Sequence, residues 1–396
     1  MRAGRQTRAM LAVLAAAVLG CALLPTSASA ADPEIAIALP PPDGRFEVGT
    51  REVEMVDRSR RDTPGSPGAR RLMVQVTYPR ASGEPCKPAR YISPLVQPIL
   101  MAAVAVDRSI GIDTGTCKGG AVARGKRPVL VFSHAFTADR FVYGALVNDL
   151  ASRGYVVLAP DHPPDAFAIE YPGGKLVEGE YGRPLTPADV TVDELASLVE
   201  LRANDVRFVL TRALKLGERD SGFLAGHLDR RRVGVLGHSL GGATATRAAQ
   251  LDRRFDAAVD IDGSLFGDWT TEDGDRTPYL LLAAEGGIGS AFGEQSLCGY
   301  MEGLRGPRFA LSLDDALHFS YSDFQALAPA IAAADPGWAF AGLYQTVVGT
   351  IDPGASIGAQ RGALTGFFAR YVLGHKRAGT PRPANGYSEL PIACQS

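Results

Sequence analysis

The sequence predicts a doubly wound α/β fold with a mostly parallel central sheet. Strand-like runs alternate with helix-like stretches along most of the chain, the strand-like runs are continuously apolar, and 46% of the 396 residues are hydrophobic. Continuously apolar strands indicate a sheet that helices cover on both faces, which is typical of parallel sheets. A chain of this length and composition can also bury a sizeable core.

The individual elements follow from these runs, which glycine and polar turns separate. Two early strands are expected at residues 50–56 and 72–78. The remaining strands are expected at residues 129–134, 155–160, 233–239, 257–262, 279–285 and 309–314. Helices are expected at residues 141–153, 189–217, 240–251, 338–350 and 357–373.

Two segments interrupt the alternation. Residues 79–127 form an insertion, far longer than the roughly 2–6 residues typical of connections in such a fold, and they contain the mostly apolar stretch 93–106. That stretch is expected either to cover the sheet edge as a surface helix or to act as a lid over an acyl or lipid pocket. Residues 163–188, rich in proline, glycine and charge, are expected to form a long loop beside the site.

The N-terminus has the pattern of a secretory signal peptide. A basic stretch at residues 1–8, an apolar run at 9–24 and small residues at 28–30 follow one another in the order that export requires. The apolar run is shorter than the roughly 20 residues that span a bilayer, which disfavours the alternative of a retained membrane anchor. We therefore expect a signal peptide at residues 1–30, cleaved near Ala30, and a single domain at residues 31–396 that is secreted or periplasmic.

Four cysteines follow the expected cleavage site: Cys86, Cys117, Cys298 and Cys394. An even number of cysteines in an exported chain indicates two disulfides. Among the alternative pairings we favour Cys86 with Cys117 and Cys298 with Cys394, because the first two bracket one segment. Metal binding is the weaker alternative, since the four cysteines include no C-x-x-C pair and no adjacent histidine.

A serine lies between glycines where an apolar strand is expected to end and an alanine-rich helix to begin. The stretch GVLGHSLGGATA, residues 234–245, contains the pattern G-x-S-x-G with Ser239 at its centre. This pattern is typical of the sharp strand-to-helix turn that presents a nucleophilic serine in α/β-hydrolases. Phosphate binding at the helix N-terminus is the lesser alternative, because the stretch lacks both the P-loop lysine and G-x-G-x-x-G spacing.

A serine nucleophile needs a general base and an acid that orients the base. In α/β-hydrolases the chain order is serine, acid, histidine, which leaves His318 and His375 as candidate bases. His318 is preferred because it follows the last long strand by a few residues, whereas His375 lies in a basic stretch at a helix end. For the acid, Asp262 and Glu285 end successive strands, and sheet position alone slightly favours Glu285.

Four blocks of sequence occur in the order and at the spacing of a known family. They are residues 129–162, which begin VLVFSHAFTADR, then GHSLGGAT, VDIDGSLFG and HFSYSDF. Over roughly residues 125–325 the chain resembles the secreted platelet-activating factor acetylhydrolases and their bacterial relatives, which are α/β-hydrolases. The resemblance implies that Asp262 is the acid and His318 the base, and that the backbone amides of Leu240 and Phe136 form the oxyanion hole.

One departure from the family concerns the turn that carries Phe136. The family commonly has His-Gly there, whereas this chain has His134 and Ala135, so the role of the Phe136 amide depends on the backbone angles that alanine adopts. His134 is expected to be a structural hydrogen-bonding residue, and His238 to point away from the catalytic side. Four aromatic residues are expected either to line an acyl pocket or to pack in the core: Phe136, Phe266, Trp269 and Phe319.

Together these features predict a secreted serine hydrolase that cleaves carboxylic esters through an acyl-enzyme, without a metal or an organic cofactor. The resemblance implies short-chain acyl esters or sn-2 acyl groups of phospholipids as substrates, with transient contact to a lipid surface. The alternatives are a polyester- or cutin-type hydrolase, a lipase-like hydrolase and, least favoured, a non-catalytic binding protein. Nucleic acid is not an expected partner, because the net charge is −2 and no basic stripe occurs.

Overall fold

A sheet of ten strands organises the computed structural model, which describes residues 34–62, 68–180, 190–219, 221–271, 274–285, 294–378 and 387–389. The strands of this sheet are β2 (Val48–Arg61), β3 (Ala69–Pro79), β5 (Cys117–Lys118), β6 (Arg127–Ser133), β7 (Val156–Pro160), β10 (Leu228–His238), β11 (Ala257–Ile261), β12 (Tyr279–Ala283), β13 (Arg308–Leu313) and β14 (Tyr387–Glu389). Their order is β14-β13-β12-β11-β10-β6-β7-β3-β2-β5. The strands from β13 to β7 are parallel, whereas β14, β3 and β2 run antiparallel to their inner neighbours. The expected mostly parallel α/β sheet is confirmed, and the expected signal peptide lies outside the described residues.

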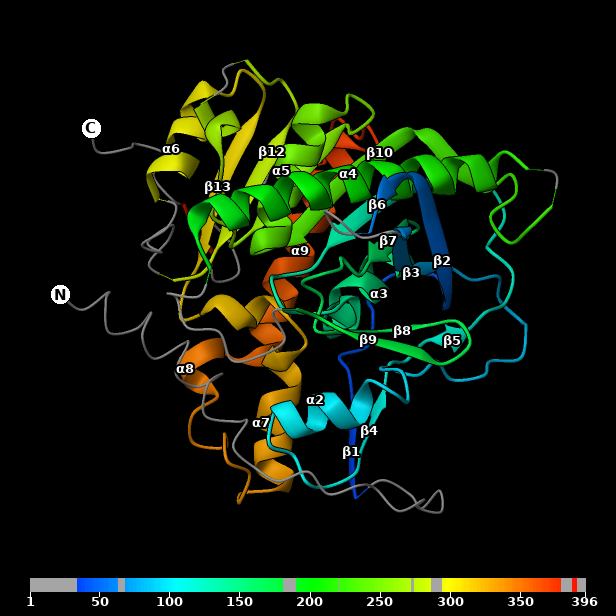
Figure 1. Cartoon of the computed structure of the whole chain (residues 1–396), viewed down its shortest axis with the longest axis vertical. Coiled ribbons are helices and arrows are strands. Elements are labelled where there is room, and N and C mark those ends of the chain that lie inside the picture. Colours follow the sequence, from blue (N-terminus) through cyan, green and yellow to red (C-terminus); the bar gives the residue numbers. More distant parts are fainter. Residues whose placement is uncertain are drawn as a thin grey trace.

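Helices cover both faces of this sheet (Figure 1). The helices are α2 (Gln97–Ala103), α3 (Gly144–Ser152), α4 (Val192–Gly217), α5 (Leu240–Leu251), α6 (Glu294–Gly303), α7 (Phe324–Ala334), α8 (Gln345–Val348) and α9 (Pro353–Tyr371), with 3₁₀ turns η2 (Arg140–Tyr143), η3 (Asp268–Thr271) and η4 (His318–Tyr321). Successive side chains of a strand point to opposite faces. In β6, Val129 and Val131 accordingly pack with α4 and α5, and Leu130 and Phe132 pack with α3 and α9.

Helix α4 carries polar residues on its buried side. It begins with a capping box, in which the Thr191 side chain accepts from the Glu194 amide and the Glu194 carboxylate accepts from the Thr191 amide. Apolar residues spaced at helical intervals face the sheet, and Arg202 and Asp205 are buried among them. These two charged side chains reach the carboxyl ends of β6 and β7, where they take part in the networks described below.

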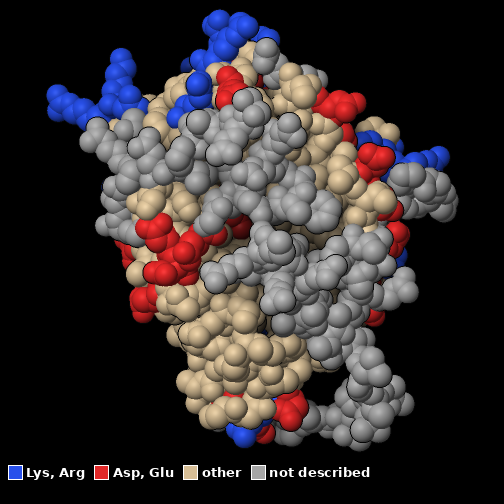
Figure 2. All heavy atoms as spheres, turned by 90° about the vertical axis from the view of Figure 1, so that its left-hand side faces the viewer, with Lys and Arg blue, Asp and Glu red and all other residues tan. Residues whose placement is uncertain are grey.

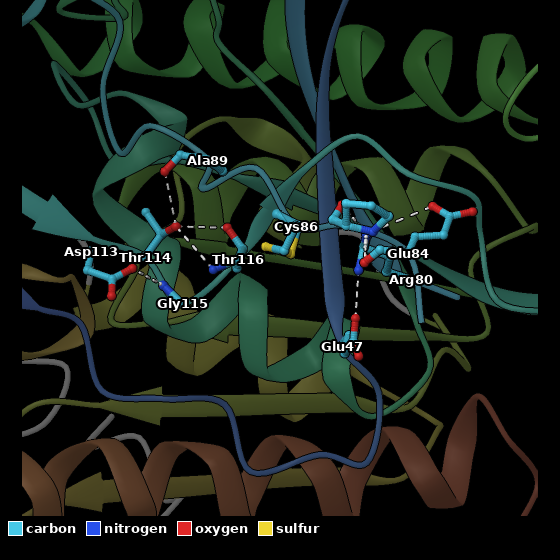
Figure 3. Close-up of a disulfide and its surroundings, with 11 residues drawn as sticks. Glu47, Arg80, Glu84, Cys86, Ala89, Asp113, Thr114, Gly115 and Thr116 are labelled. Atoms are coloured by element: carbon cyan, nitrogen blue, oxygen red, sulfur yellow. Dashed lines mark hydrogen bonds and ion pairs between the residues drawn. A yellow bond between two sulfur atoms is a disulfide. The ribbon is translucent and has the colours of Figure 1, made fainter. Parts of the chain in front are cut away.

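The insertion at residues 79–127 packs beside the main sheet. Its strand β4 (Ile110–Asp113) pairs with β1 (Ile35–Ala38), and the disulfide Cys86–Cys117 closes the segment between its start and β5. Beside this disulfide Arg80, almost completely buried, donates to Glu47 at 2.6 Å and to the carbonyl of Glu84 (Figure 3). The expected pairing of Cys86 with Cys117 is confirmed. Cys298 is also disulfide-bonded, and its expected partner Cys394 lies outside the described residues.

The apolar stretch at residues 93–106 has two separate packing sites. Val96 packs with Phe141 and Ala168, and Val106 belongs to a cluster with Leu327 and Trp338 from the C-terminal part of the chain. The stretch therefore connects the 3₁₀ turn η2 with α7. The lid role remains a prediction.

Three sequence expectations about secondary structure were incomplete or wrong. The helix expected at residues 338–350 is reduced to the single turn of α8, which ends where Gly349 takes a positive φ of 80°, and residues 338–344 form turns before it. Helix α7, which contains Pro329, was not expected. The segment 163–188, expected as a loop, contains the hairpin of β8 (Ala168–Tyr171) and β9 (Lys175–Glu178).

The surface over α7 and α8 is poor in charge. Residues 324–351 include one charged side chain, Asp335, and Figure 2 shows a mostly tan area in the lower part of the molecule, with a few acidic and basic side chains at its lower end. Within the described part of the chain, no helix has the length and apolar character needed to cross a membrane.

Candidate active site

Ser239 occupies a tight turn between β10 and α5. Its backbone angles, φ 58° and ψ −125°, are rare for a residue with a side chain. The turn is fixed from outside by a 2.8 Å hydrogen bond from the Ser239 amide to the carbonyl of Ile261 in β11. Although Ser239 holds the cap position of α5, its side chain makes no capping hydrogen bond, so the hydroxyl is not used by the helix.

The glycines around Ser239 are required by close backbone packing. A Cβ atom on Gly237 would lie 2.1 Å from the carbonyl oxygen of Gly241, and one on Gly241 would lie 2.1 Å from the carbonyl oxygen of Ser133. Gly242 is equally restricted, because a Cβ there would lie 1.9 Å from Oδ1 of Asp260. These contacts give the G-x-S-x-G-G pattern a direct steric cause.

His318 and Asp262 form a short hydrogen bond. Nδ1 of His318 donates to Oδ2 of Asp262 at 2.5 Å, and Oδ1 of Asp262 accepts from the Ala284 amide at 2.8 Å. Burial raises the pKa of Asp262, but the hydrogen bond and charge of His318 outweigh it and hold the pKa below its ordinary value. The ionised carboxylate fixes the proton on Nδ1, so Nε2 of His318 is the nitrogen that can accept a proton.

The turn that carries His318 is anchored on three sides. In η4, the Tyr321 hydroxyl donates to the carbonyl of Ala283 at 2.7 Å, and Gln360 of α9 donates to the carbonyl of Ser320 at 2.9 Å. Directly after η4, the buried carboxylate of Asp323 accepts from the amides of Gly144 and Ala145 at the start of α3, at 2.7 and 2.9 Å. The His318 side chain is left 22% exposed, so this imidazole is held firmly and still reaches solvent.

The other candidate bases and acids lie elsewhere. Glu285 is exposed at the end of β12, and its amide donates to the carbonyl of Ala316. Asp260 is fully buried and accepts from the Tyr279 hydroxyl at 3.1 Å and the Gly263 amide at 2.9 Å, and this burial raises its pKa to about 7. His375 is exposed at the end of α9. Of the two acids that strand position left open, Asp262 is the one in contact with His318.

The expected orientation of His238 is wrong. This side chain does not point away from the other site residues: its ring lies 4.5 Å from the ring of His318, centroid to centroid. It is completely buried, and its Nδ1 lies 3.0 Å from the Tyr143 hydroxyl. The cause is the strand register, because His238 is the last residue of β10 and its side chain faces α3 and η4.

The turn that contains Phe136 follows β6. Ala135 does not take a positive φ; Thr137 does, with φ 56°. The Ala135 amide donates to the Tyr143 hydroxyl at 3.1 Å, and Arg202 donates to the carbonyl of His134 at 2.7 Å. The left-handed step thus occurs one residue after Phe136, and alanine fits at position 135 without strain.

His134 and His162 are buried beside this turn. Nε2 of His134 accepts from the His162 amide at 3.0 Å and Nδ1 donates to the carbonyl of Ala135 at 2.7 Å, so the ring is neutral. Burial, together with the charge of Arg202, lowers the pKa of His134 well below its ordinary value. These contacts support the structural role expected for His134.

A second Ser-His-Asp set, not expected from the sequence, lies within the core. Nε2 of His162 is 3.0 Å from the Ser133 hydroxyl, and Nδ1 of His162 is 3.0 Å from Oδ2 of Asp205. Asp205 is also paired with Arg70, and all of these side chains are fully buried. Substrate has no access to Ser133, so the set serves as a scaffold for the turn after β6. In the sequence, the signal for this buried set was His162, the last residue of the block that ends APDH.

Three of the site residues could in principle approach one metal ion. Ligand atoms of His238, Asp262 and His318 lie within 4.8 Å of one another. However, His318 and Asp262 are already hydrogen-bonded to each other, and Nδ1 of His238 is engaged with Tyr143. The arrangement suits proton transfer better than metal binding.

The four aromatic residues fall into two groups. Phe266 and Trp269 are buried in the core cluster that includes residues of α4 and α5, and Phe136 packs against the same cluster while partly exposed. Phe319 contacts the His318 ring edge-on, with centroids 5.4 Å apart. Core packing therefore accounts for Phe266 and Trp269, whereas Phe136 and Phe319 retain partly accessible surfaces near the site.

The family model of platelet-activating factor acetylhydrolase, isoform II, matches residues 100–180 and 205–335, which is more than half of the chain and includes Ser239, Asp262 and His318. The chain belongs to this family. The resemblance expected from the four sequence blocks is thereby confirmed, and so is the α/β-hydrolase fold.

Individual relatives of this platelet-activating factor acetylhydrolase family member are similar to it over part of their length. A protein named probable 1-alkyl-2-acetylglycerophosphocholine esterase from Arthroderma benhamiae is 28% identical over 63% of this chain and 64% of its own length. The platelet-activating factor acetylhydrolase of Canis lupus familiaris is 30% identical over 35% of each chain. The match thus spans less than two thirds of these curated relatives.

A solved structure matches a larger part of the chain. The ferulic acid esterase from Streptomyces cinnamoneus aligns with 89% of this family member and 99% of its own chain, with a TM-score of 0.72 and 29% identity. The relatives and this neighbour are esterases or acetylhydrolases by name. Carboxylic ester hydrolysis is therefore the class of activity that the comparisons support.

Proposed function

We propose that the chain is a serine hydrolase in which Ser239 is the nucleophile, His318 the general base and Asp262 the orienting acid. The 2.5 Å hydrogen bond between His318 and Asp262 carries the proposal, because it leaves Nε2 of His318 as the proton acceptor beside the Ser239 turn. The strained backbone of Ser239 adds support, since such strain is typical of a nucleophile turn. The backbone amides of Leu240 and Phe136 form the oxyanion hole.

The reaction proceeds in two steps. In the first, Ser239 Oγ attacks the carbonyl carbon of the ester, its proton passes to Nε2 of His318, and that proton then moves to the departing alkoxide, which leaves as an alcohol. In the second, water adds to the acyl-enzyme, gives a proton to His318, and the carboxylic acid leaves as Ser239 regains its proton. The Leu240 amide suits the oxyanion because the first amides of a helix have no intrahelical acceptor.

The substrates are proposed to be short-chain acyl esters, including the sn-2 acetyl group of ether glycerophospholipids. Membership of the acetylhydrolase family and the name of the Arthroderma benhamiae relative support this class. An ester of ferulic acid is the second candidate, because the ferulic acid esterase structure aligns with nearly its whole length. Polyester, cutin and long-chain lipids stay as alternatives to be tested.

Export is part of the proposal. The basic, apolar and small-residue pattern of residues 1–30 and the disulfide Cys86–Cys117 both support a secreted or periplasmic location. Small-molecule or lipid esters are the proposed partners.

Two measurements test the proposal. A fluorophosphonate probe is expected to label the wild-type protein and the control Ser197→Ala, which removes an exposed hydroxyl of α4, but not Ser239→Ala. Hydrolysis is then compared for a 2-acetyl phospholipid, methyl ferulate, 4-nitrophenyl esters from acetate to palmitate, and a polyester film. Labelling that persists in Ser239→Ala contradicts the nucleophile, and preference for palmitate or polymer contradicts the short-chain assignment.

A further inference from the structure

The hydroxyl group of Tyr143 joins two parts of the proposed catalytic machinery. Its oxygen accepts from the amide of Ala135, in the turn that carries Phe136, at 3.1 Å. The same oxygen lies 3.0 Å from Nδ1 of His238, the residue before Ser239. The Ala135 amide already donates to this oxygen, and the arrangement that gives the Tyr143 proton an acceptor among the described residues points it to Nδ1 of His238.

This hydrogen bond determines the chemical form of His238. With Nδ1 acting as an acceptor, the ring carries its proton on Nε2 and is neutral. Nε2 makes no hydrogen bond of good geometry within the described residues, and the backbone of His318 lies next to it. Burial and the neighbouring His318 together lower the pKa of His238 to about 3, in agreement with a neutral ring.

A neutral ring at position 238 is important because of its neighbours. The ring of His318 lies 4.5 Å from it and that of Tyr321 6.1 Å, and among the described residues the carboxylate of Asp262 is an acidic group close to it. His318 becomes positively charged when it removes the Ser239 proton. A second positive charge on His238 would oppose that step, whereas a neutral aromatic ring supplies a rigid surface for His318.

We infer that Tyr143 and His238 are positioning residues that couple the oxyanion turn to the general base. The coupling runs from the Ala135 amide through the Tyr143 hydroxyl to Nδ1 of His238, and from the His238 ring to the His318 ring. This inference rests on the proposed serine-hydrolase function and adds two residues to it. Neither residue touches the substrate in this scheme.

The first test compares Tyr143→Phe with Tyr155→Phe. Tyr155 is an equally buried tyrosine of the same core, located at the amino end of β7, whereas the site lies at the carboxyl ends of the strands. For Tyr143→Phe we expect kcat on 4-nitrophenyl acetate to fall about 10- to 100-fold, with KM changed less than about twofold, as for a small misplacement of catalytic groups. Tyr155→Phe should retain wild-type kcat. Wild-type kcat in Tyr143→Phe, or an equal loss in both variants, overturns the inference.

The second test uses the acceptor at position 238. Asparagine can place an oxygen near the location of Nδ1, whereas leucine cannot, so His238→Asn should retain several-fold more kcat than His238→Leu.

In protein containing ¹⁵N-histidine, the NMR signals of His238 should show a protonated Nε2 and an unprotonated Nδ1 from pH 5 to 9, and should shift in Tyr143→Phe. Equal kcat in the two variants, or a protonated Nδ1 in the wild type, overturns the inference. If Ser239→Ala loses activity while Tyr143→Phe keeps the wild-type kcat, the coupling alone is refuted. If Ser239→Ala remains active, the proposed function is refuted.

Discussion

The amide of Ser239 donates a 2.8 Å hydrogen bond to the carbonyl of Ile261, which immediately precedes Asp262. The turn after β10 and the turn after β11 are therefore joined through the main chain. His318 reaches Asp262 from η4, a separate 3₁₀ turn. The sheet thus fixes the relative position of the proposed nucleophile and acid, while the position of the proposed base depends on the anchoring of one turn.

Replacing Asp262 should distinguish the two acids that the sequence left open. We expect Asp262→Asn to lower kcat by roughly 10⁴-fold, because the amide no longer holds His318 with its proton on Nδ1. Glu285→Gln, which changes an exposed side chain at the end of the next strand, should stay within about twofold of wild type. The check is kcat on 4-nitrophenyl acetate, and a larger loss in Glu285→Gln than in Asp262→Asn would contradict the assignment.

Gly241→Ala should destabilise the protein strongly. The added Cβ would lie 2.1 Å from the carbonyl oxygen of Ser133, and neither backbone can yield without moving the Ser239 turn. We expect a loss of about 3 kcal/mol or more in the free energy of unfolding.

The matched control is Gly358→Ala in α9, where a Cβ would meet no atom within 4 Å. That variant should gain about 0.5–1 kcal/mol, because alanine is the better helix former. Urea denaturation measures both changes. Equal stability of the two variants would show that the space around Gly241 is not as tight as described.

Removing the disulfide should cost stability. Cys86 and Cys117 are separated by 31 residues, and loop-closure entropy predicts a loss of about 3–4 kcal/mol in Cys86→Ser/Cys117→Ser. Since Cys298 is also disulfide-bonded, the double variant isolates this bond better than a reducing agent does. Urea denaturation without reductant is the measurement, and an unchanged midpoint would mean that the insertion is held by its packing alone.

The stability of the protein should depend on pH through Asp260. Burial raises the pKa of this carboxyl to about 7 in the folded state, whereas the unfolded chain loses the proton near pH 4. Between about pH 4 and 7 the native state therefore binds more protons, and the free energy of unfolding falls as the pH rises.

Asp260→Asn should remove this part of the pH dependence. The part removed is a change of up to about 4 kcal/mol in the free energy of unfolding between pH 4 and pH 8. Buried Asp139 and Asp323, whose pKa values are raised to about 7 and about 6, act in the same direction in both proteins and cancel in the comparison. Urea denaturation at several pH values gives the result. Parallel curves for wild type and Asp260→Asn would contradict the role of Asp260.

The main sheet was predictable because its strands are continuously apolar and its helices have clear periodicity. The edges were not. Strands β1, β4, β8 and β9 are short, and pairing between Ile35 and Ile110 depends on chain segments that are far apart in sequence. Helix α7 was missed because Pro329 lies inside it, and local propensity argues against a helix there.

The candidate site could be proposed from the sequence where a residue type coincides with a place at or just after the end of an expected strand. Ser239 and His318 satisfy this condition, whereas Asp262 and Glu285 both end strands and were separated by the family resemblance. The orientation of His238 could not be read from the pattern, because it depends on the position of Tyr143 on a different element. The buried set around His162 likewise joins three distant segments.

That buried set has a practical consequence for chemical probing. The buried residues Ser133, His162 and Asp205 are of the same types as the proposed Ser239, His318 and Asp262, but they are shielded from solvent, whereas Ser239 and His318 are partly exposed. A geometric template for a Ser-His-Asp triad that ignores burial will therefore find Ser133. Electrophilic inhibitors should modify only Ser239, and an adduct on Ser133 would be a sensitive reporter that the core has opened.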